Sequence, residues 1–177
     1  FGLLRFNIRT SGQEHLPPGG YLLVGAAHRG WMDPFVVMHA LPVEPRAWFL
    51  GSAPSTFTSR SRERFVHKVG GLLPVWRGGV TIDQHVASAR AVVGNGAVFV
   101  QMPEGTVSGP AGTTGPFRIG WAVIALRTGA PIVPIAMAGT DDATLLAKGW
   151  PDGDLYRFEG GLKELPGVMF HSIMTPI

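Results

Sequence analysis

Short apolar runs alternate along the chain with segments of helical periodicity. Buried strands are predicted at 21–27, 46–51, 72–77, 97–102, 132–138 and 168–174. Helices are predicted at 33–41, 59–68, 81–93 and 117–128. Strands that alternate with helices are typical of βαβ units. We therefore predict one α/β domain over residues 1–177, with a largely parallel or mixed sheet flanked by helices and a site at the carboxyl ends of the strands.

Local signals refine these elements. The run at 21–27 is continuously apolar, as in a strand covered on both faces of its sheet. Pro74 interrupts the predicted third strand, which favours an edge position because proline cannot donate to a ladder. Thr81 and Gln84 have the spacing of a capping box at a helix start. Gly129 is expected to end the helix that precedes it.

Composition narrows the class of protein. Of the 177 residues, 45% are hydrophobic and 15% are charged, against an average of about 25% charged, which excludes a disordered chain. The absence of cysteine excludes disulfides, cysteine–zinc sites and thiol nucleophiles. The net charge of +3 suits anionic lipid or phosphate ligands but is too small to indicate nucleic acid. No run approaches the roughly 18 apolar residues of a membrane span. Because the chain begins at Phe1, we expect it to be a piece of a longer protein.

Three polar residues stand at the ends of predicted strands. His28 follows the first strand, Arg77 ends the third, and Glu104 follows the fourth. The carboxyl ends of parallel strands share one edge of a sheet, where open α/β folds bind ligands. We therefore expect these residues to lie at one site.

His28 is followed five residues later by Asp33, where a helix is predicted to begin. A tight turn can fold the carboxylate onto one imidazole nitrogen, which fixes the tautomer and strengthens the other nitrogen as a base. With no serine nucleophile nearby, the hydroxyl to be activated would belong to a substrate. The alternative is structural: an aspartate before Pro34 is also a common helix N-cap. Asp33 can serve both roles.

The loop at 103–106 and Arg77 are candidates for binding an anion. A glycine-containing loop after a strand can present backbone N–H groups, and an arginine fork suits phosphate or carboxylate. An ordinary turn and a solvated arginine are the alternatives.

The chain lacks a G-x-S-x-G elbow, a P-loop and an H-E-x-x-H motif. The segments it does contain resemble the glycerolipid acyltransferase family, best known for 1-acyl-glycerol-3-phosphate (lysophosphatidate) acyltransferases. The family's H-x4-D motif matches His28 to Asp33, and its glycine-to-arginine strand resembles 71–77. Its P-E-G-T motif resembles 103–108, its V-P-V-like strand resembles 132–135, and its aromatic–basic–glycine segment is similar to 117–120.

The resemblance implies that a fatty acyl group passes from acyl-CoA or acyl-carrier protein to the hydroxyl of a lysophospholipid, with 1-acyl-glycerol-3-phosphate as the leading acceptor. It implies that His28 is the general base, that Asp33 orients it, and that no acyl-enzyme forms. No metal or bound cofactor is expected. The acceptor site implied by the resemblance consists of Arg77, Glu104, Gly105, Thr106 and, more weakly, Arg118.

Two departures from the family pattern open alternatives. Ala27 stands where the family often has asparagine, and Val107 stands where it usually has arginine. One phosphate-binding charge is therefore missing, and either Arg118 compensates for it or the acceptor is not lysophosphatidate. The alternatives are an acyltransferase for a different acceptor, such as another lysophospholipid, glycerol 3-phosphate or an uncharged hydroxyl, and a non-catalytic lipid-binding module.

The segment 59–68 carries four basic side chains, Arg60, Arg62, Arg64 and Lys68, beside two apolar ones. A basic amphipathic stretch can lie on an anionic membrane, or it can be a solvated helix face. Together with a lipid substrate, this segment leads us to expect a peripheral protein on the cytoplasmic face of a membrane.

Overall fold

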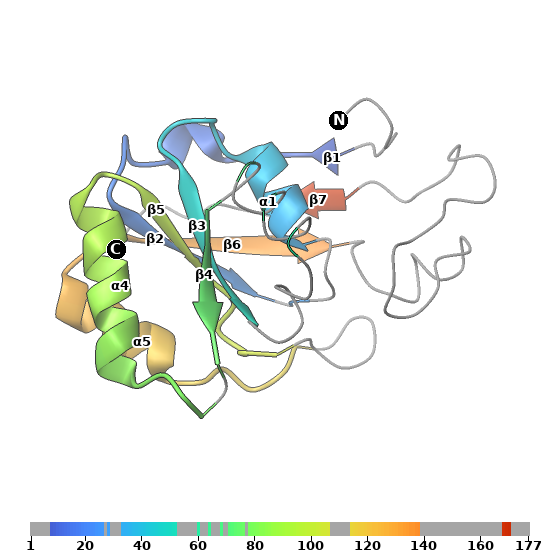
Figure 1. Ribbon diagram of the computed structural model, residues 1–177. Coiled ribbons are helices and arrows are strands. Elements are labelled where there is room, and N and C mark those ends of the chain that lie inside the picture. Colours follow the sequence, from blue (N-terminus) through green and yellow to red (C-terminus); the bar gives the residue numbers. More distant parts are fainter. Residues whose placement is uncertain are drawn as a thin grey trace.

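The protein forms a sheet with helices on both of its faces (Figure 1). The computed structural model describes residues 8–26, 28, 33–52, 60, 64, 68, 71–76, 78–106, 114–138 and 168–170. Its strands are β1 (Ile8–Arg9), β2 (Tyr21–Ala26), β3 (Ala47–Ser52), β4 (Gly71–Val75), β5 (Val98–Gln101), β6 (Ile132–Ala138) and β7 (Val168–Phe170). Its helices are the 3-10 turn η1 (Gln13–His15), α1 (Asp33–Ala40), α4 (Ile82–Gly94) and α5 (Gly120–Thr128).

The strand order is β1-β7-β6-β2-β5-β3-β4. The strands β6, β2, β5, β3 and β4 pair in parallel, whereas β7 runs antiparallel to β6. The predicted α/β class with a largely parallel sheet is thus confirmed. Strand β4 lies at the edge, as Pro74 predicted, and β2 lies between β5 and β6. This order brings the carboxyl ends of β2 and β5 together, which positions the site described below.

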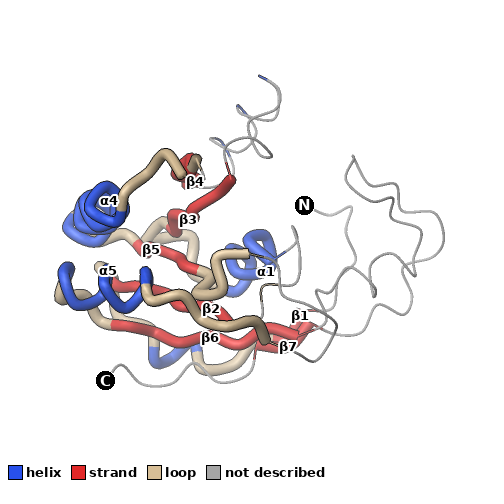
Figure 2. Tube along the Cα trace, turned by 90° about the horizontal axis from the view of Figure 1, so that it is seen from below, coloured by secondary structure: helices blue, strands red, loops and turns tan. Residues whose placement is uncertain are grey.

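Alternate side chains of each inner strand pack on opposite faces of the sheet. Leu23 joins a core cluster under α1, whereas Leu22 joins a second cluster under α4 and α5. Both side chains are fully buried. This arrangement explains the uninterrupted apolar run of β2, because a strand covered on both faces has no polar side. Figure 2 shows α4 and α5 side by side on one face of the sheet.

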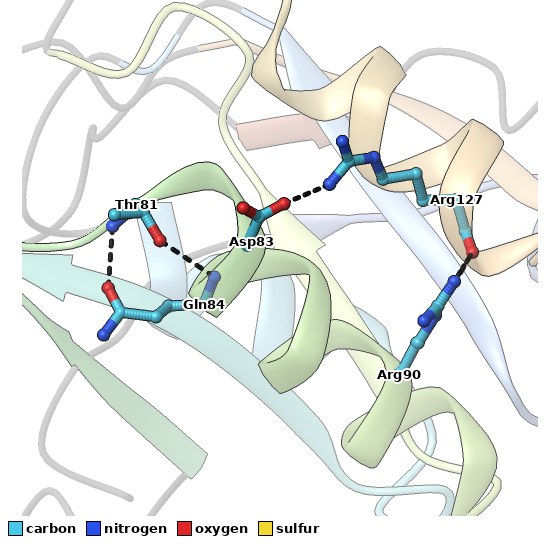
Figure 3. Close-up of polar contacts among 5 residues, drawn as sticks. All are labelled: Thr81, Asp83, Gln84, Arg90 and Arg127. Carbon is cyan, nitrogen blue, oxygen red and sulfur yellow. Dashed lines mark hydrogen bonds and ion pairs between the residues drawn. The ribbon is translucent and has the colours of Figure 1, made fainter.

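Polar contacts cap the start of α4 and join this helix to α5 (Figure 3). The Gln84 backbone N–H donates to Thr81 Oγ1, and the Thr81 N–H donates to Gln84 Oε1, which confirms the predicted capping box. Asp83 forms an ion pair with Arg127 of α5, and the Arg90 guanidinium donates to the Arg127 carbonyl. These contacts set α5 beside α4.

The predicted boundaries need several corrections. Helix α5 begins at Gly120 and not at 117, because residue 118 is held outside the helix: its backbone N–H donates to the Pro103 carbonyl. Strand β4 ends at Val75. Strand β1 and the 3-10 turn η1 were not predicted. The predicted helix at 59–68 falls mostly outside the described residues, although Arg60, Arg64 and Lys68 are helical and exposed. Of the predicted strand at 168–174, only Val168–Phe170 is described.

The Gly71→Ala variant should be destabilised by about 1–3 kcal/mol, a magnitude typical of overpacking. A Cβ at residue 71 would lie 2.4 Å from Trp48 Cδ2 on the paired strand. The proximal part of an indole ring cannot swing away without moving β3. Gly94→Ala is the matched control, because nothing lies within 4 Å of a Cβ there. Urea unfolding of both variants measures the difference, and equal stabilities would contradict this packing.

His85 should make the fold sensitive to acid. Burial lowers the pKa of this imidazole, and its Nε2 is buried without a hydrogen-bond partner among the residues described. The unfolded chain takes up a proton near pH 6.5, whereas the folded chain resists it, so stability is present above that pH and is lost as the pH falls through it. Between pH 7 and pH 5, Tm should therefore fall less in His85→Gln than in the wild type. The exposed His39→Gln should show the wild-type fall, and parallel pH profiles of wild type and His85→Gln would contradict the prediction.

Candidate active site

The site lies where β2 and β5 end. These neighbouring strands are parallel, with Val24 paired to Gln101 at the last step of their ladder. His28 follows β2, and Glu104 follows β5. The two residues meet: the His28 backbone N–H donates to Glu104 Oε2 over 3.1 Å. His28 and Glu104, which were predicted to lie together at the ends of these strands, are thus in contact.

The His28 imidazole contacts the Asp33 carboxylate. Nδ1 of His28 lies 2.5 Å from Oδ2 of Asp33, which is the first residue of α1. Asp33 is completely buried, whereas the His28 side chain is 21% exposed. A buried carboxylate on Nδ1 holds the proton on that nitrogen, and Nε2 is then the nitrogen that can accept a proton. The arrangement has the form of a histidine–aspartate dyad at the rim of the sheet.

Glu104 is buried, with only 2% of its surface exposed. Its Oε2 accepts the His28 N–H, and its Oε1 accepts the Gly115 N–H over 2.9 Å. The carboxylate therefore joins the loop after β2 to the segment before α5. Gly115 was not predicted as part of the site, and the sequence gives little signal for it, because the residue contributes only its backbone.

A tight turn follows Glu104. The Gly105 N–H donates to the Met102 carbonyl, so this N–H closes the turn and does not face a ligand. Gly105 has a φ of +66°, and a Cβ there would lie 2.9 Å from Arg118 Cδ, so both backbone and space require glycine. Thr106, the next residue, is exposed.

Arg118 crosses over this turn. Its Nε donates to the Glu104 carbonyl over 3.1 Å, and its backbone N–H donates to the Pro103 carbonyl over 2.8 Å. The side chain is exposed. Within the described part of the chain, Nε is the only guanidinium nitrogen of Arg118 that donates a hydrogen bond.

Several predicted features lie outside the described residues. They include Arg77, the clearest phosphate candidate, and the two departures at Ala27 and Val107. Within the described part of the chain, no group of three or more histidine, aspartate or glutamate residues is placed to hold a metal ion. The same part contains no helix of the length and apolarity that crossing a membrane requires.

Comparison with known proteins adds three findings. The model of the Acyltransferase family matches residues 7–138 of the 177. No curated protein sequence matches the chain significantly. The fold is similar to the crystal structure of the 1-acyl-sn-glycerophosphate (LPA) acyltransferase PlsC from Thermotoga maritima, with a TM-score of 0.65 and 20% sequence identity. The match covers 98% of this chain and 62% of that one, so the chain spans less than two thirds of its structural neighbour.

Proposed function

We propose, from the premise that the chain belongs to the Acyltransferase family, that it transfers a fatty acyl group from a thioester to the hydroxyl of a lysophospholipid. The leading acceptor is 1-acyl-glycerol-3-phosphate, and the donor is acyl-CoA or acyl-carrier protein. The contact between His28 Nδ1 and the buried Asp33 carboxylate carries this proposal. It supplies a base with a fixed tautomer near the protein surface, where a hydroxyl can reach it.

The proposed reaction is direct transfer. His28 Nε2 removes the proton of the acceptor hydroxyl as that oxygen attacks the thioester carbonyl. The tetrahedral intermediate collapses, the carbon–sulfur bond breaks, and the thiolate takes the proton from the imidazolium. Asp33 stabilises the imidazolium while it exists. The protein forms no covalent intermediate and requires no metal or bound cofactor in this scheme.

The acceptor phosphate would lie beside the turn at Gly105. Arg118 supports this placement, because its Cδ and Nε lie over that turn and the residue is exposed. Arg77 and Thr106 are the other proposed contacts. Arginine binds phosphate through two parallel N–H groups, which gives both charge and direction.

A second acceptor class is favoured by one observation. Val107 stands where the resembling family usually has arginine, so the site has one cation fewer for a phosphate. Another lysophospholipid, glycerol 3-phosphate or an uncharged hydroxyl compound would then be the acceptor, with the same base. The non-catalytic lipid-binding module is the remaining alternative.

A panel of acceptors tests these proposals. The full-length protein is given palmitoyl-CoA or palmitoyl-acyl-carrier protein with lysophosphatidate, other lysophospholipids, glycerol 3-phosphate or monoacylglycerol. We expect the highest kcat/KM for lysophosphatidate. A preference for an uncharged acceptor would overturn the phosphate assignment and leave the chemistry standing.

The exposed basic residues Arg60, Arg64 and Lys68, together with a lipid substrate, also support a peripheral location on the cytoplasmic face of a membrane. Because the substrate and the product are both lipids, such a location would let the protein exchange them with the bilayer directly. Phosphatidic acid biosynthesis is the process in which a lysophosphatidate acceptor would place the protein.

A further inference from the structure

We propose that Glu104 is a positioning residue, which fixes the backbone of His28 and does not bind the acceptor. The inference rests on the proposed function, because it concerns the geometry of the proposed base. It departs from the acceptor-binding role that the family resemblance implies for this glutamate.

Glu104 is almost completely buried. Only 2% of Glu104 is exposed, so a substrate phosphate or hydroxyl has almost no access to its carboxylate. A buried carboxylate would also repel a phosphate placed beside it. Burial and charge thus both argue against direct contact with the proposed acceptor.

Both carboxylate oxygens of Glu104 accept hydrogen bonds from distant parts of the chain. Glu104 Oε2 accepts the N–H of His28, and Oε1 accepts the N–H of Gly115. The donors lie 76 and 11 residues away from Glu104 in the sequence. One side chain thus ties together the loop that carries the base and the segment that leads to Arg118.

The main chain of Glu104 is itself held. Arg118 donates from Nε to the Glu104 carbonyl and from its backbone N–H to the Pro103 carbonyl. Gly105 N–H closes the turn onto Met102. Hydrogen bonds hold the Glu104 backbone, and both carboxylate oxygens accept N–H groups. The carboxylate therefore has a fixed position, and it fixes the position of the His28 backbone in turn.

A second contact sets the His28 ring. Asp33 holds Nδ1, and Glu104 holds the backbone N–H of the same residue. One carboxylate orients the imidazole, and the other locates the main chain that bears it. Displacement of a reacting group by about 1 Å can cost about 10²-fold in rate.

The proposed role requires a side chain with two terminal oxygens that both accept hydrogen bonds. An ionised carboxylate has two acceptor oxygens, whereas a carboxamide has one acceptor and one donor. In Glu104→Gln, one of the two N–H groups would face an NH₂ group, and that link would be lost. We expect kcat to fall by about 10–100-fold, while the acceptor KM and the preference between phosphorylated and uncharged acceptors stay within about twofold.

A second measurement tests the position of the His28 backbone without enzyme turnover. Hydrogen exchange followed by NMR on the wild-type protein should show the His28 amide protected by at least tenfold relative to an unstructured reference amide, and Glu104→Gln should lose that protection. The exposed Glu14→Gln is the matched control and should change neither exchange nor kinetics. If Glu104→Gln does not fold by circular dichroism, Glu104→Asp replaces it, because a side chain shorter by one methylene cannot span both donors.

The outcomes separate the two proposals. A fall in kcat with loss of His28 amide protection supports the positioning role. A tenfold rise in acceptor KM at unchanged kcat, or a wild-type His28 amide that exchanges as fast as the reference, overturns it. Absence of turnover by the wild type with every acceptor would contradict the proposed function, and the amide measurement would still decide whether Glu104 holds the His28 backbone.

Discussion

The His28→Gln variant should lose about 10²–10⁴-fold in kcat, the range attributed to general acid–base catalysis. Glutamine preserves a polar side chain of similar reach but cannot accept a proton near neutral pH. The loss should fall on kcat more than on KM, because the base acts on the transition state and contributes little to ground-state binding. Steady-state rates with a saturating thioester donor measure the effect.

His39→Gln is the matched control for this substitution. His39 lies exposed in the last turn of α1, on the helix that Asp33 begins, and has no part in the proposed reaction. It should retain wild-type kcat. Equal rates for wild type and His28→Gln would remove His28 from the role of base.

The Asp33→Asn variant should lose about 10²–10⁴-fold in kcat as well, which is comparable to the loss of the orienting carboxylate in serine-protease triads. Asp33 Oδ2 accepts from His28 Nδ1, whereas an amide NH₂ in that place would favour the opposite tautomer. The proton-accepting nitrogen would then be occupied by a proton. The effect should again appear in kcat at saturating acceptor and donor.

Asparagine also separates the two interpretations of this residue. It caps helices about as well as aspartate, so a purely structural Asp33 would leave both activity and Tm nearly unchanged in Asp33→Asn. Loss of activity with Tm within a few degrees of the wild type supports the orienting role. Retained activity would show that Asp33 has only a structural role at the start of α1.

The order of elements could be predicted because each has a strong local signal. Apolar runs indicated β2, β5 and β6, and Pro74 indicated that β4 is an edge strand. The capping box at Thr81 fixed the start of α4 to within one residue. These signals arise from neighbouring residues in the sequence and do not require knowledge of the tertiary structure.

The start of α5 could not be predicted for the opposite reason. Residues 117–119 continue the helical pattern, but Arg118 is held by the Pro103 and Glu104 carbonyls, which are distant in the sequence. Tertiary hydrogen bonds thus override local propensity. The short strand β1 could not be predicted either, because its two residues pair with β7, which is distant in the sequence.

The same distinction applies to the site. The contact between His28 and Asp33 spans five residues and could be inferred from spacing and residue type. The environment of Glu104 could not, because its burial depends on N–H donors from His28 and Gly115. A carboxylate beside a predicted anion site is ordinarily assigned to the ligand, and only the fold shows where its oxygens point.

Direct acylation of a lysophospholipid is the reaction proposed for this protein. The most direct measurement incubates the full-length protein with isotopically labelled acyl-CoA, or the equivalent acyl-carrier protein, and lysophosphatidate, and follows both lipid and thiol by mass spectrometry. We expect labelled phosphatidate and free thiol in equal amounts, with no acylated protein. Lipid binding without any acylated product, from either donor and every acceptor in the panel, would contradict it and identify the domain as a lipid-binding module.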